Sequence, residues 1–157
     1  LVLSTLHTND APSAITRLID MGMEDFLLSS TIIGILAQRL IRVACPDCRV
    51  PYVPDPAILR EMLRDGEKTE GWRIIEVRGC EQCAHTGYWG RSGIFEFLEI
   101  DDDIRKLILE KRDSNIIKEV ARKKGMRTLR EDGWLKVRQG LTTIPEVLRV
   151  TQVEEVI

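Results

Sequence analysis

The chain has 157 residues, of which 43% are hydrophobic and 31% are charged, and its formal net charge is −2. This is an ordinary globular composition that can bury one or two modest cores, with no apolar run of the roughly 18 residues that a membrane helix needs and no signal-peptide pattern. The acidic balance disfavours generic nucleic-acid binding, and we expect the protein in the cytoplasm.

The first predicted elements are a strand and a helix, joined by a short polar loop. Residues 1–6 form an apolar, partly β-branched run that is typical of a buried strand. Asn9 or Asp10 then caps a helix that Gly22 ends. His7 is therefore expected at the carboxyl end of a strand, where open α/β sheets bind their ligands. The alternative is a histidine that only makes local hydrogen bonds.

Four further segments lie around and between the cysteines. A helix is predicted over residues 24–33, followed by a strand over residues 35–43 that runs into Cys45. Asp55 and Pro56 begin a short helix that continues to Leu63 and is closed by Gly66. A short strand is predicted over residues 73–77, ahead of the second cysteine pair.

The four cysteines form two Cys-x-x-Cys pairs, Cys45 with Cys48 and Cys80 with Cys83. Each pair supplies two thiolates from one tight turn, and two such pairs are the ligand set of a tetrahedral zinc ion. Four thiolates leave no open coordination position, so the predicted zinc is structural and takes no part in catalysis. The alternatives are reduced core cysteines, two disulfides, or a thiol redox pair.

The remainder of the chain predicts one strand and four helices. The glycines at positions 87, 90 and 93 match neither the dinucleotide fingerprint nor the Walker loop, so they favour a turn beside the metal that leads into a strand over residues 92–98. Asp101 or Asp102 caps the first helix. A second helix carries residues 117–121, Gly125 and Gly140 bracket a third, and Thr143 with Glu146 forms a capping box for the fourth.

Several of these segments together resemble the secretion ATPases, the hexameric motors of type II secretion and type IV pilus assembly. Residues 4–18 and 37–40 are similar to the histidine box and the downstream strand of that family. The two cysteine pairs and residues 87–96 resemble its assembly branch, because the pilus-retraction branch usually lacks the cysteines. The closing stretch, residues 126–147, is similar to the same proteins.

The resemblance implies an α/β fold, namely the carboxy-terminal part of a RecA-like P-loop ATPase domain with an inserted zinc subdomain and a terminal helical subdomain. The implied divisions are residues 1–44, 45–99 and 100–157. The chain contains no Gly-Lys pair, so the Walker loop that binds ATP and Mg²⁺, and the Walker B strand, are expected before Leu1. We therefore interpret the chain as a fragment that is inactive by itself.

The resemblance also implies roles for three side chains outside the cysteine pairs. His7 is expected to sense the γ-phosphate, since an imidazole can donate to an anion and titrates near neutral pH. Arg17 and Arg91 are candidates for contacts to phosphate or to a neighbouring subunit, and surface ion pairs are the alternative for both. The implied partners are copies of the same protein in a homo-hexamer and the inner-membrane platform proteins of a secretion or pilus system, with no nucleic acid.

A different class of protein is the main alternative. A zinc-ribbon interaction module without enzymatic activity would bind protein or nucleic acid through its basic helices, with Trp72, Tyr88 and Trp89 as a stacking surface. The negative net charge disfavours nucleic acid, and packing over the metal site is the expected role of the aromatic residues. A catalytic zinc of the deaminase type would need a His-x-Glu motif, which the chain lacks.

Overall fold

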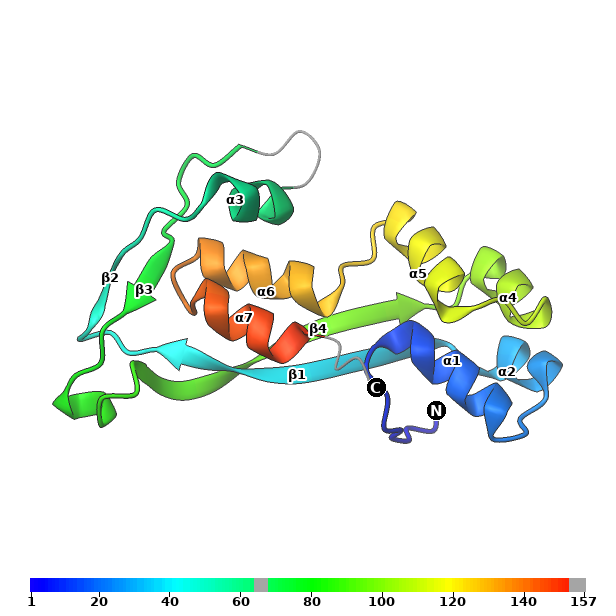
Figure 1. Ribbon diagram of the computed structural model, residues 1–157. Coiled ribbons are helices and arrows are strands. Elements are labelled where there is room, and N and C mark those ends of the chain that lie inside the picture. Colours follow the sequence, from blue (N-terminus) through cyan, green and yellow to red (C-terminus); the bar gives the residue numbers. More distant parts are fainter. Residues whose placement is uncertain (64–67, 153–157) are drawn as a thin grey trace. The chain divides into compact units, whose positions relative to one another are not determined.

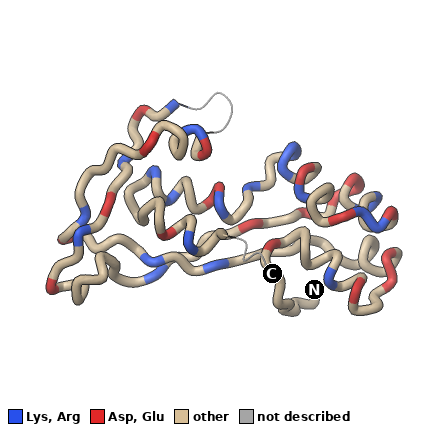
Figure 2. The backbone as a smooth tube through the Cα atoms, in the orientation of Figure 1, with Lys and Arg blue, Asp and Glu red and all other residues tan. Residues whose placement is uncertain are grey.

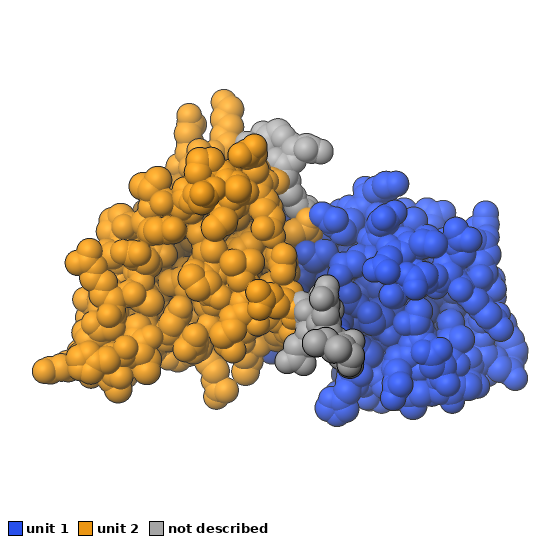
Figure 3. Space-filling view, in the orientation of Figure 1, with its two compact units in different colours: residues 1–38, 95–129 blue, residues 39–94, 130–157 orange. Residues whose placement is uncertain are grey.

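The computed structural model describes residues 1–63 and 68–152. Contacts within the chain group it into two compact units, each assembled from two separate stretches of sequence (Figure 3). Unit 1 comprises residues 1–38 and 95–129, and unit 2 comprises residues 39–94 and 130–157. The mixed α and β content confirms the predicted fold class at that level, while the division into three segments at residues 44 and 99 stays a prediction.

Two long strands pair with each other and contribute residues to both units. β1 (Gly34–Ala44) and β4 (Tyr88–Glu99) form a two-stranded sheet, and their arrows run in opposite directions in Figure 1. β1 confirms the strand predicted over residues 35–43. β4 begins before Ser92, the predicted start, so the predicted glycine-rich turn is largely part of the strand.

Unit 1 packs four helices against its segments of the two strands. These are α1 (Ala11–Asp20), α2 (Asp25–Thr31), α4 (Asp102–Leu109) and α5 (Ser114–Lys123). All four helices were predicted, although α2 ends before residue 33, its predicted end. Apolar side chains from every one of them meet in one buried cluster with Leu98 and Ile100. Its other members are Ala11, Ile15, Leu28, Ile104, Ile108, Ile117, Ala121 and Met126.

The start of α1 shows why this helix begins where it does. The Asp10 carboxylate accepts a hydrogen bond from the backbone N–H of Ser13 at 3.0 Å, which satisfies one of the free amides of the first turn. The ammonium of Lys118, on α5, pairs with the same carboxylate at 2.8 Å. The predicted cap is therefore confirmed, and it also ties α1 to α5.

The strand predicted over residues 1–6 is absent, and this prediction is wrong. These residues have no regular secondary structure and are exposed. A strand needs a neighbour to satisfy its backbone hydrogen bonds, and none of the four strands described pairs with residues 1–6. His7 consequently follows an irregular segment and not a strand end, although it does precede α1 as predicted.

A buried carboxylate holds two helix starts together in unit 1. Glu96 alternates with Ile94 and Leu98 on the covered side of β4, and it is only 1% exposed. Its two oxygens accept hydrogen bonds from the backbone N–H groups of Ala11 at 2.8 Å and Leu129 at 3.2 Å. Burial raises the pKa of Glu96, and the two amide donations oppose that rise. Glu96 therefore caps the first residues of α1 and α6 at once.

Unit 2 contains a second core, formed mainly by helices. α3 (Pro56–Met62), α7 (Ile144–Thr151) and most of α6 (Leu129–Arg138) supply Met62, Trp134, Val137, Ile144 and Val147, and Ile74 completes the cluster. Two short strands, β2 (Arg49–Pro51) and β3 (Ile75–Val77), pair in antiparallel register. The predicted helix after Asp55 is confirmed, ending at Met62, while its predicted closure at Gly66 lies outside the described residues.

The start of α7 differs from the predicted capping box. The Thr143 side chain makes no cap hydrogen bond, and its hydroxyl pairs with the Tyr88 hydroxyl at 2.7 Å. The Glu146 carboxylate is buried and accepts from the guanidinium groups of Arg42 at 2.6 Å and Arg149 at 2.7 Å. Two charge-assisted partners bind a carboxylate more strongly than one backbone amide, so tertiary contacts replace the local cap.

The ion pairs of Glu146 predict an acid-sensitive contribution to stability. Burial raises the pKa of Glu146, but the hydrogen bonds from Arg149 and Arg42 outweigh burial and lower it from 4.5 to about 2. A depressed folded-state pKa stabilises the fold above pH 4.5, and this gain is lost as the pH falls toward 2. Glu146→Gln should lower the free energy of unfolding by up to about 3 kcal/mol at neutral pH, and by about half as much near pH 3. Urea denaturation of both proteins at the two pH values measures the difference. An equal difference at both would contradict the ion-pair explanation.

Candidate metal centre

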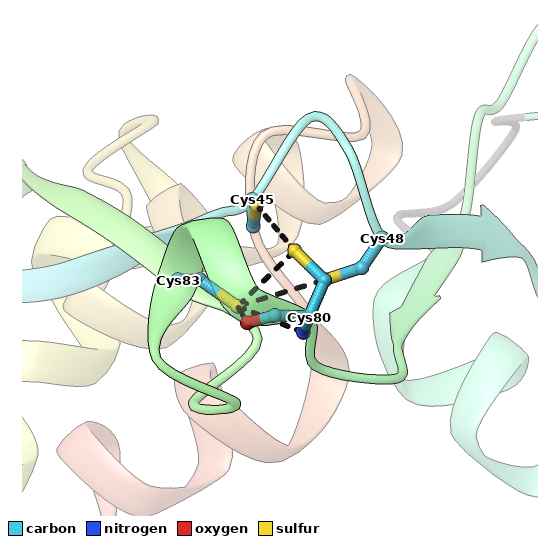
Figure 4. Close-up of side chains that lie close together, drawn as sticks. All are labelled: Cys45, Cys48, Cys80 and Cys83. Atoms are coloured by element: carbon cyan, nitrogen blue, oxygen red, sulfur yellow. Dashed lines mark hydrogen bonds between the residues drawn. The ribbon is translucent and has the colours of Figure 1, made fainter.

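The four cysteines, distant in sequence, meet at one end of unit 2. Cys45 directly follows β1, and Cys48 directly precedes β2. Cys80 precedes and Cys83 ends the short 3-10 helix η1 (Glu81–Cys83). Figure 4 shows the four side chains directed toward one another. All four sulfur atoms lie within 4.8 Å of one another, and three of the residues are buried. The predicted grouping is therefore confirmed.

The spacing of the sulfur atoms fits a tetrahedral metal site. The Sγ atoms of Cys45 and Cys80 are 3.9 Å apart, those of Cys48 and Cys83 are 3.9 Å apart, and those of Cys80 and Cys83 are 3.7 Å apart. Four thiolates bound to zinc at about 2.3 Å at the corners of a tetrahedron would be about 3.8 Å from one another. Disulfide bonds would require about 2.0 Å, and all four cysteines are free. The disulfide alternative is therefore excluded in this structure.

The backbone around Cys83 favours a thiolate. The N–H groups of Cys80 and Gly87 both donate to its sulfur at 3.2 Å. Burial raises the pKa of Cys83, but these donations outweigh it and lower the pKa to about 6. At Cys80 the N–H of Cys83 lowers the pKa, whereas burial and the neighbouring sulfurs raise it to about 11. A cation is the partner that would let all four sulfurs ionise together.

Two glycines make the second cysteine turn sterically possible. Gly79 has φ +82°, and a Cβ there would come within 2.6 Å of the His85 carbonyl oxygen. Gly87 has φ +79°, and a Cβ there would come within 2.5 Å of Val77. Left-handed backbone and close approach both favour glycine. The chain can therefore fold back tightly enough for Cys80 and Cys83 to share one site.

The aromatic residues near the cysteines do not pack over the metal site, which corrects the prediction. The side chains around the cluster are Val77 and the cysteines themselves. The Tyr88 ring lies under the Arg42 guanidinium, 4.1 Å from its centroid, and the Trp72 ring lies under that of Arg138 at 4.2 Å. Trp89 is exposed. A guanidinium over the face of an aromatic ring is a favourable cation–π contact, and Tyr88 and Trp72 each make one.

The three residues expected to act on nucleotide lie outside this cluster. His7 and Arg17 belong to unit 1, Arg91 belongs to unit 2, and all three are exposed. Among the described residues, no hydrogen bond or ion pair engages their side chains. Arg17 and Arg91 therefore form none of the surface ion pairs considered as their alternative role, within the described part of the chain. Their functional roles stay predictions.

Sequence reasoning missed two buried carboxylates that organise the units. Glu96 received no role, and Glu146 was assigned only a local cap. The position of Glu96 could have been inferred from the sequence. It is two residues from both Ile94 and Leu98, and residues two apart in a strand face the same side. For Glu146 the partner Arg42 is remote in sequence, and only the folded chain brings them together.

These features define a mixed α/β chain with a four-thiol site that can hold a metal ion. None of the described helices is long and apolar enough to cross a membrane. The chain belongs to the type II/IV secretion system protein family, whose sequence model matches residues 1–149.

Curated relatives include both type IV pilus assembly proteins and type II secretion proteins. The chain is 50% identical, over 96% of its length, to the type IV pilus assembly ATPase PilB of Thermus thermophilus. It is 49% identical, over 97%, to the type II secretion system protein HxcR of Pseudomonas aeruginosa, and 46% identical, over 97%, to the type II secretion system ATPase E of Vibrio cholerae. The matches span 17%, 28% and 30% of these relatives' own lengths.

Proposed function

We propose that this chain is the carboxy-terminal part of a hexameric cytoplasmic ATPase that couples ATP hydrolysis to type II secretion or type IV pilus assembly. The observation that carries the proposal is the family match over residues 1–149, together with close to 50% identity to proteins named as such ATPases. In the proposed motor, unit 1 and unit 2 belong to the end of a RecA-like domain and its zinc-bearing and helical additions. The inner-membrane platform proteins of the system are the proposed partners, which would make the motor peripheral to that membrane.

The proposed metal is a structural Zn²⁺ bound by Cys45, Cys48, Cys80 and Cys83. Three sulfur–sulfur distances of 3.7–3.9 Å support it, with all four sulfurs within 4.8 Å of one another. The all-thiolate ligand set, which zinc accepts in closed sites, supports it as well. When bound, the ion would supply no chemistry beyond fixing two distant chain segments. ATP and Mg²⁺ would bind elsewhere in the full-length motor, because the chain has no Gly-Lys pair.

Three exposed residues are proposed to serve the nucleotide or the subunit interface. His7 would contact the γ-phosphate from the segment before α1, and Arg17 would present a guanidinium from α1 itself. Arg91, near the start of β4, would act in the same way toward phosphate or a neighbouring subunit. Their lack of partners among the described residues supports these roles, because a guanidinium that stabilises phosphate must not be neutralised by a carboxylate of its own.

The interaction-module alternative receives less support. It needs a basic surface, but Lys/Arg and Asp/Glu are interspersed along α4 and α5 in Figure 2. It also needs a surface of free aromatic faces, but arginines cover one face of both Trp72 and Tyr88, so Trp89 is the one exposed ring of the predicted three. Retention of single-stranded DNA by the full-length protein, insensitive to competing protein partners, would favour this alternative.

The proposal predicts that ATPase activity belongs to the full-length protein and is lacking in residues 1–157 alone. The short chain has no phosphate-binding loop and no lysine to stabilise the transferring phosphoryl group. A phosphate-release assay on both proteins measures the difference. Turnover that stays with the short chain through several chromatographic steps would contradict the proposal, and so would a full-length protein without ATPase activity.

A further inference from the structure

Unit 2 contains a groove of about 640 Å³ beside the β2–β3 pair. Residues 49–54 and 72–75 form most of its lining, and the other lining residues are Leu59, Thr69 and residues 139–140. We call it the Arg49–Arg73 groove. It is separate from the cysteine cluster, and none of the residues proposed to act on nucleotide lines it.

The charged residues that line the groove, among those described, are all basic. Arg49 and Arg73 both line it, and no aspartate or glutamate among the described residues does. One guanidinium nitrogen of Arg49 donates to the Gly140 carbonyl at 3.3 Å, which leaves the positive charge uncompensated. Within the described part of the chain, no carboxylate pairs with either guanidinium. Two uncompensated guanidiniums in one groove favour an anionic ligand, with carboxylate or phosphate groups as their natural partners.

The rest of the lining favours a peptide over a nucleic acid. Pro51 is exposed, and Tyr52 and Val53 are 39% and 89% exposed, so these three residues give the groove its accessible apolar surface. Ile74 and Ile75 also line it but are almost buried. A nucleic-acid base needs an aromatic face on which to stack. The Trp72 ring already lies under Arg138 and packs against the core of unit 2. Among the described lining residues this leaves Tyr52 as the one exposed ring, which is too little for successive bases to stack on. Aliphatic surface and proline suit apolar peptide side chains better than bases.

The backbone that carries the groove is well anchored. Arg49, Val50 and Pro51 pair with Val77, Glu76 and Ile75, and the Tyr52 N–H continues the ladder to the Ile74 carbonyl at 3.0 Å. The Arg73 N–H donates to the Arg138 carbonyl at 2.8 Å. A preformed site loses less entropy on binding than one that must order itself. Pro51 has no N–H to offer an added strand, so side chains, and not strand addition, would carry recognition.

We propose that the Arg49–Arg73 groove binds an extended acidic peptide segment of a partner protein. Arg49 and Arg73 each pair with one carboxylate of the segment, and an apolar residue near those carboxylates packs against Tyr52 and Val53. The proposal goes beyond the ATPase function and does not depend on it, because it rests only on the lining and charge of the groove.

A random-peptide display library selected on the full-length protein tests this proposal, and the most enriched sequence is then synthesised with a fluorescent label. The expected result is an enrichment of aspartate and glutamate beside bulky apolar residues. In fluorescence polarisation, the double variant Arg49→Gln/Arg73→Gln should bind that peptide about tenfold or more weakly than the parent, since two charge-assisted contacts are lost. Val53→Asp, at a highly exposed position of the groove, should also weaken binding, by charge repulsion.

The control is Arg112→Gln/Arg127→Gln, which removes the same charge at two exposed positions outside the groove. It should bind the peptide within about twofold of the parent, because neither arginine lines the groove and salt screens charges that make no direct contact. The proposal is overturned if no peptide is enriched, if the enriched peptides are not acidic, or if the control weakens binding as much as the groove variant. It is equally overturned if an oligothymidylate displaces the best peptide and binds more tightly, because the groove would then be a nucleic-acid site.

Discussion

Loss of the proposed zinc from the full-length protein should unfold the cysteine-bearing part of unit 2 while leaving unit 1 folded. Structural zinc contributes on the order of 10 kcal/mol of apparent binding free energy to folding. The β2–β3 pair begins directly after Cys48, and the Arg78 N–H donates to the Cys48 carbonyl at 3.2 Å. We therefore expect Cys45→Ser/Cys83→Ser to lose hydrogen-exchange protection over residues 45–51 and 75–87. Metal analysis should fall from about one zinc per chain to near zero.

Gln82→Ala is the matched control for the cysteine variant. Gln82 lies between Cys80 and Cys83 in the sequence, and it is exposed. The control should keep about one metal equivalent and parental exchange protection. A parent protein that purifies without metal and is nevertheless folded would refute the structural zinc. Collapse of unit 1 together with unit 2 would show that the metal acts on more than the segments it joins.

His7→Ala in the full-length protein should reduce ATP turnover by about 100-fold. This is the effect of losing one positioned catalytic group, and it follows from the proposed contact between His7 and the γ-phosphate. The side chain is exposed, and none of the hydrogen bonds found among the described residues involves it. The thermal midpoint of unfolding should therefore stay near that of the parent. Steady-state ATP hydrolysis and thermal denaturation measure the two effects separately.

Leu18→Ala is the comparison for His7→Ala, because it should lower stability and leave the activity of the folded protein unchanged. Leu18 lies on α1, half-buried against the core of unit 1. Its truncation should cost about 2 kcal/mol, the lower end for leucine to alanine because the site is only half-buried. Activity per folded molecule should then remain close to the parental value. If His7→Ala hydrolyses ATP at the parental rate, or melts as early as Leu18→Ala, His7 has a structural role only.

The sequence by itself determined the elements whose signals are local. The helix after Asp55 begins where predicted, and the observed caps Asp10 and Asp101 are each one of two candidates that the sequence offered. A carboxylate that accepts from nearby backbone amides needs no distant partner. The apolar stripe of α1 faces the core for the same reason, because helical periodicity is a property of the segment. The paired cysteines likewise predicted their own cluster, since two ligands from each turn restrict the possible geometries.

Only the tertiary structure decided the features that depend on residues far apart in the chain. The apolar run over residues 1–6 reads as a strand, yet a strand exists only beside a paired neighbour, and none of the described strands pairs with it. Glu146 reads as a local cap but is taken by Arg42 and Arg149. The two uncompensated arginines of the groove meet because β2 pairs with β3. Local patterns do not determine these outcomes, because strand pairing, the Arg42–Glu146 ion pair and the groove lining all need segments that only folding brings together.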